Sequence, residues 1–261
     1  MLNFVYGDMV GSYLNHFNGK KNFSDFKLNS AGIGSNTVLL AASLDSINRN
    51  DISIDVFSEW VFRFGDQHSS GSEEFGINFG PYFYELMTHK KGYKENVDTN
   101  RYFPIAYACG LKSKTVEEAQ ELCLRMLELF TINEITINQT MALSAIFHLV
   151  NLGHGKNGIS MFLKHHLDCY IDLDLDVNSS KLDNTCSSSS GLSESLIIGL
   201  GGYMTNSTIN RIANLGGDIG SNCAIASACV NRGKGGNFFI KKLIQYRLNK
   251  INKKLNIITK N

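Results

Sequence analysis

Proline, paired cysteines and long apolar runs are scarce or missing in this chain of 261 residues, which contains only two prolines. Helices can therefore run long, because proline is the residue that removes a backbone donor and breaks them. The six cysteines form no C-x-x-C pair, and nothing in the sequence indicates the secretory context in which disulfides form. No run of about 18 apolar residues occurs, so the sequence predicts no membrane-spanning helix.

A charge excess of either sign is also missing, since the formal net charge is +1. Nucleic-acid-binding proteins usually carry a basic excess, so the composition argues against a nucleic-acid partner. Residues 1–14 lack the basic region and clean apolar stretch of a signal peptide, and we expect a cytoplasmic protein. Hydrophobic residues make up 43% of the chain, which is enough for a sizeable core in one domain over residues 1–261.

Helical periodicity runs through most of the chain, and strand-type alternation is scarce. Thr115 and Glu118 form a capping-box pattern that predicts a helix over 115–130, and Asp51 is predicted to cap a helix over 52–65. Further helices are expected over 37–47, 135–152, 191–205, 206–214, 221–232 and 237–255, with a polar surface loop at 176–190. The sequence therefore predicts an all-α fold.

Two glycine-marked segments near opposite ends of the chain carry the clearest motifs. The first reads Gly-Asp-Met-Val-Gly-Ser over 7–12 and is followed by Gly-Ser-Asn-Thr over 34–37. The second reads Asn-Leu-Gly-Gly-Asp-Ile-Gly-Ser over 214–221 and opens a helix of small residues. Both resemble the ADP-ribosylglycohydrolase family, which begins G-D-x-x-G-S, brings Thr-Asp-Asp-Thr to a helix start and later carries L-G-G-D-x-D-T.

The middle of the chain is similar to the family as well, in the same order and spacing. Phe75-Gly76 with Phe79 resembles Y-G-G-x-F, Asn96 with Arg101 and Pro104 resembles N-G-x-x-M-R-x-x-P, and Thr131 with Asn133 keeps part of T-H-N-H-P. The resemblance implies an orthogonal bundle of α-helices around a cleft that holds two Mg²⁺ ions. It also implies hydrolysis of a glycosidic bond between ADP-ribose and a protein or nucleic-acid acceptor.

The metal positions of the family are mostly replaced in this chain. Carried over, they fall on Gly34, Ser35, Asn36, Asp218, Gly220 and Ser221. Asp218 is the unchanged carboxylate and Ser221 keeps a hydroxyl, whereas Mg²⁺ takes most of its binding from carboxylates. Two ions beside one carboxylate would leave buried charge unpaired. We therefore expect no bound metal, with Asp218 and Ser221 as the residual candidates and Mg²⁺ required only if the chain is an active hydrolase.

The expected site has Asp218 as its catalytic candidate. Asn15 stands where subgroups of the family have a glutamate, and an amide cannot shuttle a proton. The turn before the second small-residue helix can hold a diphosphate on free backbone amides without a metal. The ligand-binding candidates are Ser35, Asn36, Thr37, Asn96, Arg101, Gly216, Gly217 and Ser221.

Structural interpretations of the same residues stay open beside the functional ones. Asp218 can be a helix N-cap, and Arg101 can form a structural ion pair. The glycines at 7, 11, 216 and 217 can serve close helix packing or a positive φ. The basic helix over 237–255 is best interpreted as a solvated face, with contact to nucleic acid or anionic lipid as the alternative.

Three functions follow from these patterns. The leading hypothesis is a catalytically impaired ADP-ribosylglycohydrolase homologue that binds ADP-ribose or an ADP-ribosylated macromolecule and acts as a binding or regulatory protein, with a possible protein partner and no membrane. The second is an active ADP-ribosyl hydrolase with an altered metal site. The third is a structural or interaction protein whose cleft is vestigial.

Overall fold

Helices account for the regular structure of the computed structural model, which describes residues 1–16, 23–28, 31–65, 101–130, 132–165, 171–177, 191–202, 205–230 and 238–260. No extended strand occurs within these ranges, so the all-α prediction is confirmed for them. The first half contains α1 (Leu2–His16), η1 (Phe23–Asp25), α2 (Ser35–Arg49), α3 (Ile54–Gly65), α5 (Phe103–Lys112), α6 (Val116–Leu127) and α7 (Glu134–Asn151). The second half contains α8 (Lys156–Lys164), α9 (Leu192–Leu200), α10 (Thr205–Leu215), α11 (Ile219–Cys229), α12 (Phe238–Ile251), η6 (Lys253–Leu255) and α13 (Asn256–Lys260).

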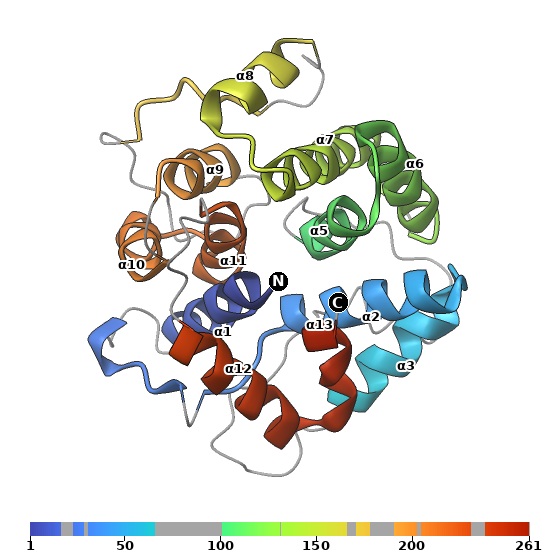
Figure 1. Cartoon of the computed structure of the whole chain (residues 1–261), viewed down its shortest axis with the longest axis vertical. Helices are drawn as coiled ribbons and strands as arrows, with labels where there is room; N and C mark the ends of the chain where they lie inside the picture. The colour runs from blue at the N-terminus through green and yellow to red at the C-terminus, as the bar shows by residue number, and fades with distance from the viewer. Residues whose placement is uncertain are drawn as a thin grey trace.

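The centre of the bundle is the pair α1 and α11, which come from opposite ends of the chain and lie side by side (Figure 1). Helix α11 consists mainly of small and apolar residues and is buried from Gly220 to Cys229. A helix with this pattern belongs inside a fold, because it has no polar face to present to water. Helices α9, α10 and α12 pack around this pair, while α5, α6 and α7 form a second group. Helix α2 connects the two groups by contacting both α1 and α5.

Local capping signals place two helix starts correctly. The Thr115 hydroxyl oxygen accepts a hydrogen bond from the Glu118 amide at 3.1 Å, and α6 begins at the next residue as expected. Its apolar stripe, which includes Cys123 and Met126, is buried. Helix α7 also follows the prediction within one residue at each end, and Asn133 caps it by accepting from the Thr136 amide at 2.8 Å.

Three helix predictions need correction. The helix expected over 191–205 ends at Leu200, where Gly201 is its C-cap. Helix α3 begins at Ile54, so Asp51 lies three residues before it and is not its N-cap. The Asp51 carbonyl instead accepts from Ser46, after Asn50 has ended α2 in a left-handed conformation. The helix expected over 237–255 ends at Ile251, because Asn252 is extended and caps the short helix η6.

The described residues include only part of the regions that other sequence predictions concern. Residues 178–190 of the predicted loop lie outside the described residues, as do Phe75, Gly76, Phe79, Asn96 and Thr131. No helix in the described ranges is long and apolar enough to cross a membrane. The assignment of residues 1–261 to one domain stays a prediction.

Candidate functional site

The carboxylate of Asp8 on α1 caps the start of α2. Gly34, the N-cap position of α2, has no side chain to accept the free amides of the first turn. Oδ2 of Asp8 accepts from the backbone amides of Gly34 at 2.9 Å and Thr37 at 3.1 Å, and from the Thr37 hydroxyl at 2.5 Å. Its Oδ1 accepts from Nδ2 of Asn36 at 3.0 Å. One buried carboxylate thus fixes the segment 34–37 on α1.

Burial and hydrogen bonding act on Asp8 in opposite directions. Its side chain is fully buried, and this desolvation raises the pKa of its carboxyl above the ordinary value, while the hydrogen bonds from Thr37, Asn36 and Gly34 lower it. The net direction is upward. Asp8 therefore combines a strong set of donors with the free-energy cost of placing a charge away from water.

The raised pKa of Asp8 predicts a pH dependence of stability with a definite sign. A carboxyl whose folded pKa exceeds its unfolded pKa stabilises the fold most when both states are protonated, and this contribution is lost as pH rises through the folded pKa. We expect the unfolding free energy of the wild type, minus that of Asp8→Asn, to be largest in acid and to fall from about pH 4 upward. Urea unfolding of both proteins at several pH values measures it; a difference that rises with pH would contradict the prediction.

One stripe of α1 connects α2 to the start of α11. Asp8, Ser12 and Asn15 are spaced i, i+4 and i+7, which places them on one face of a helix. Nδ2 of Asn15 donates to Oδ1 of Asp218 at 3.3 Å. A methyl group built on Gly34 would collide with the Ser12 hydroxyl, and one built on Gly220 would lie 3.2 Å from Nδ2 of Asn15. The starts of α2 and α11 therefore both contact the same two turns of α1.

Asp218 is the N-cap of α11. Its Oδ1 accepts from the Ser221 amide at 3.2 Å, and its backbone carbonyl accepts from the Asn222 amide at 2.9 Å. The two residues before it, Gly216 and Gly217, have φ of 89° and 70°. These positive angles suit glycine because other residues are strained there. The two glycines therefore allow the turn that places Asp218 at the start of α11.

A buried thiol lies where α1 packs against α11, since the Cβ of Cys223 is 3.1 Å from a methyl group built on Gly11. Burial raises the pKa of Cys223 on α11, and the charges of Asp218 and Asp8 raise it further. Both carboxylates therefore act on one sulfur from the two sides of the α1–α11 contact. The Cys223 thiol stays protonated near neutral pH, so it is not an activated nucleophile.

The predicted site residues fall into three groups. Ser35, Asn36, Thr37, Gly216, Gly217, Asp218 and Ser221 are brought together around α1, from segments about 180 residues apart in sequence. Arg101 is half-buried just before α5, which packs against α2, α6 and α7. Asn96 lies outside the described residues. Asn36 and Thr37 donate to Asp8, and ligand binding by any of these residues stays a prediction.

Asp8 and Ser12 are the residues of this junction that the sequence interpretation did not single out. Asp8 belongs to the quoted Gly-Asp motif, but it was not assigned a role. A signal was available, because a lone acid within the apolar stretch Asn-Phe-Val-Tyr-Gly-Asp-Met-Val has to find donors when its helix is buried. Which donors it finds depends on the tertiary contact with α2.

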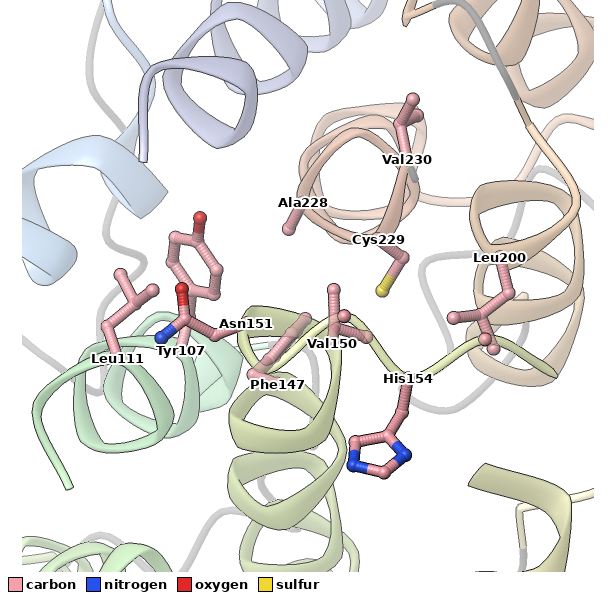
Figure 2. A pocket seen from close by; sticks show the side chains of 12 residues that line it. Tyr107, Leu111, Phe147, Val150, Asn151, His154, Leu200, Ala228, Cys229 and Val230 are labelled. Carbon is pink, nitrogen blue, oxygen red and sulfur yellow. The ribbon is translucent and has the colours of Figure 1, made fainter. Parts of the chain in front are cut away.

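A hollow lies at the C-terminal end of α11, away from this junction (Figure 2). Phe147 and Val150 of α7 converge there with Cys229 of α11 and Tyr107 of α5, and the volume is about 120 Å³. This is below the roughly 300–1,000 Å³ of typical ligand pockets. Among the described residues, no Lys, Arg, Asp or Glu lines it. Burial raises the pKa of Cys229 to about 12, so this hollow offers neither a nucleophile nor cationic side chains for an anion.

Comparison with known proteins does not assign the chain to a family. Within the described residues, no three His, Cys, Asp or Glu side chains are grouped so that they could hold a metal ion. A scan against protein-family models finds no match, and a search of curated proteins finds none either.

Proposed function

We propose that this protein has the ADP-ribosylglycohydrolase type of helical bundle and binds ADP-ribose, free or attached to a macromolecule, without acting as a magnesium-dependent hydrolase. The supporting observation is the junction on α1, where the segments that resemble the family's two metal-binding motifs meet around Asp8, Ser12 and Asn15. Chance resemblance of short motifs gives no reason for segments so far apart in sequence to share one helix face.

The junction has the chemistry of an anion site. The starts of α2 and α11 both lie there, and a helix N-terminus carries a partial positive charge. The amides of Ser35, Asn36 and Gly220 are in first turns, where no carbonyl four residues earlier is available to them within the helix. Diphosphate oxygens are good acceptors for such amides. The diphosphate of ADP-ribose is therefore the group that we expect this junction to hold.

The carboxylates of the junction do not fit a pair of Mg²⁺ ions. Both oxygens of Asp8 already accept hydrogen bonds, four in total, and the residue is buried. Asp218 is engaged by the Ser221 amide and by Asn15. Each Mg²⁺ needs near-octahedral oxygen ligands that also balance its charge. The donors around Asp8 are already engaged by its carboxylate, so an anion would rely on the first-turn amides of Ser35, Asn36 and Gly220, and no free carboxylate pair remains to balance two cations.

Calorimetric titration of ADP-ribose tests the proposal directly. We expect binding whose dissociation constant changes less than about two-fold between a Mg²⁺ buffer and a chelator, since no carboxylate pair couples the ligand to a metal. Incubation of an ADP-ribosylated protein with the chain and Mg²⁺ should release no ADP-ribose. Binding that requires Mg²⁺, or robust release, would establish the hydrolase instead, and no heat in either buffer would establish a vestigial cleft.

A charge variant locates the binding site. Ser35→Asp adds a carboxylate in the first turn of α2, where the helix dipole tolerates it, and we expect about ten-fold weaker ADP-ribose binding from repulsion of the diphosphate. Asn206→Asp is the matched control, because Asn206 is exposed in the first turn of α10. Both should melt near the wild-type temperature. Equal weakening in the two variants would contradict a site at α2.

A further inference from the structure

The charges of this nearly neutral chain are distributed very unevenly. Residues 219–261 contain nine Lys and Arg and no Asp or Glu, whereas residues 1–218 contain sixteen Lys and Arg and twenty-four Asp and Glu. The formal net charge of +1 is therefore the sum of a basic segment, residues 219–261, and an acidic segment, residues 1–218. A basic excess confined to one face attracts polyanions even when the whole protein is neutral.

The helix α12 places part of this charge on one exposed face. Lys242, Tyr246 and Lys250 are spaced by four residues, so they follow each other along one side of the helix. Asn249 is exposed beside them, and Lys253 is exposed directly after the helix end. We call Lys242, Tyr246, Asn249, Lys250 and Lys253 the basic stripe. The opposite side of α12 is occupied, since Ile244 and Leu248 are in the core and Arg247 donates to the Ala31 carbonyl at 2.7 Å.

Tyr246 is the unusual member of the stripe because its side chain is 65% exposed. A large aromatic ring at a helix surface normally gains by packing on neighbours. Here the ring stands between two lysines one turn away on either side, which leaves a flat apolar face flanked by positive charge. An aromatic face with cations at this spacing is the arrangement that stacks a base while its phosphates are neutralised.

We propose that the basic stripe binds single-stranded nucleic acid, with a base stacked on Tyr246 and backbone phosphates on Lys250, Lys253 and Lys242. A membrane surface fits less well, because an interfacial helix needs an apolar face to insert, and the apolar face of α12 is buried in the protein. Lys242 and Lys250 are eight residues apart on α12, which is about 12 Å at the helical rise, and Lys253 follows two residues after the end of the helix. This length accommodates about three nucleotides, so three phosphate contacts are the natural number.

The proposal departs from the expectation that total charge gives. Net charge alone argued against nucleic acid, because it averages the acidic remainder with the basic end. Two cations of the C-terminal segment do not belong to the stripe. Lys254 is bound to Glu59 at 2.6 Å, and Arg247 is buried. The proposal depends on the lysines and the tyrosine that face water.

Fluorescence anisotropy with labelled oligo-dT and oligo-U of about twelve nucleotides tests the stripe. We expect binding at low salt, with log K falling against log salt at a slope of about −2, as three phosphate contacts on a single strand require. Tyr246→Ala should weaken binding about ten-fold, while Tyr246→Phe keeps the ring and should bind like the wild type. Lys250→Glu should weaken binding and make the slope shallower.

Matched controls separate the stripe from general electrostatics. Lys164→Glu makes the same charge change at an exposed position on α8, on the far side of the molecule from α12 (Figure 1), and should leave binding nearly unchanged. Ser35→Asp should also leave it unchanged, which keeps this result independent of the ADP-ribose site. The proposal is overturned if Lys164→Glu and Lys250→Glu weaken binding equally, if Tyr246→Ala has no effect, or if phosphatidylserine vesicles bind and the oligonucleotides do not.

Discussion

Replacing Asp8 with alanine is expected to lower the free energy of unfolding by about 4 kcal/mol, because removing one partner of a buried charged network leaves the others unpaired. The amides of Gly34 and Thr37, the Thr37 hydroxyl and the Asn36 amide group would all lose their acceptor. Water cannot replace the carboxylate easily, since the position is fully buried between α1 and α2. The start of α2 would lose its cap at the same time.

Urea unfolding followed by circular dichroism measures this loss. Asp55→Ala is the control, because Asp55 is an exposed acid in the first turn of α3 and its removal should cost less than about 1 kcal/mol. Thr37→Val removes one donor to Asp8 while preserving the shape of the side chain, and should cost about 1–2 kcal/mol. If Asp8→Ala were as mild as Asp55→Ala, Asp8 would not be the residue that holds α2 on α1.

Contacts within a few residues are the part of this fold that the sequence predicts best. The Thr115–Glu118 cap and the start of α7 depend on neighbours three residues apart, so the local pattern contains the whole interaction. Asp51 has the same local appearance as a cap, yet α3 starts later because Asn50 turns the chain in a left-handed conformation. Helix α12 likewise ends before the predicted boundary, because Asn252 is extended and its side chain accepts from the Lys254 amide at the start of η6.

The sequence predicts which segments form the candidate site, but it does not predict which of their side chains form hydrogen bonds with each other. The paired motifs brought attention to 34–37 and 216–221, which do meet on α1. The sequence does not state that Asn36 and Thr37 turn toward Asp8, because that contact joins residues 28 and 29 positions apart through the packing of two helices. Likewise, total charge does not reveal the basic stripe, since which lysines face water depends on which face of α12 is buried.

Replacing Gly11 with alanine is expected to cost about 3 kcal/mol of unfolding free energy, as inserting a methyl group into a tightly packed contact does. A Cβ at this position would lie 2.6 Å from the Ile219 carbonyl oxygen and 2.7 Å from the Gly220 Cα. Both are backbone atoms of α11, so no side chain can rotate away, and α1 and α11 must separate. The gain of about 1 kcal/mol from replacing glycine inside a helix offsets this only in part.

The same separation should reach the candidate site, because Ile219 and Gly220 form the first turn of α11 beside Asp218. We therefore expect Gly11→Ala to weaken ADP-ribose binding as well as stability, whereas Ser35→Asp should weaken binding alone. Gly158→Ala is the control: this glycine is inside α8 and its nearest neighbour is the exposed His154 side chain. Alanine there should raise the free energy of unfolding by up to about 1 kcal/mol and leave ADP-ribose binding unchanged. A Gly11→Ala protein as stable as the wild type would mean that α1 and α11 do not approach as closely as described. A destabilised protein with normal binding would place the ADP-ribose site away from the start of α11.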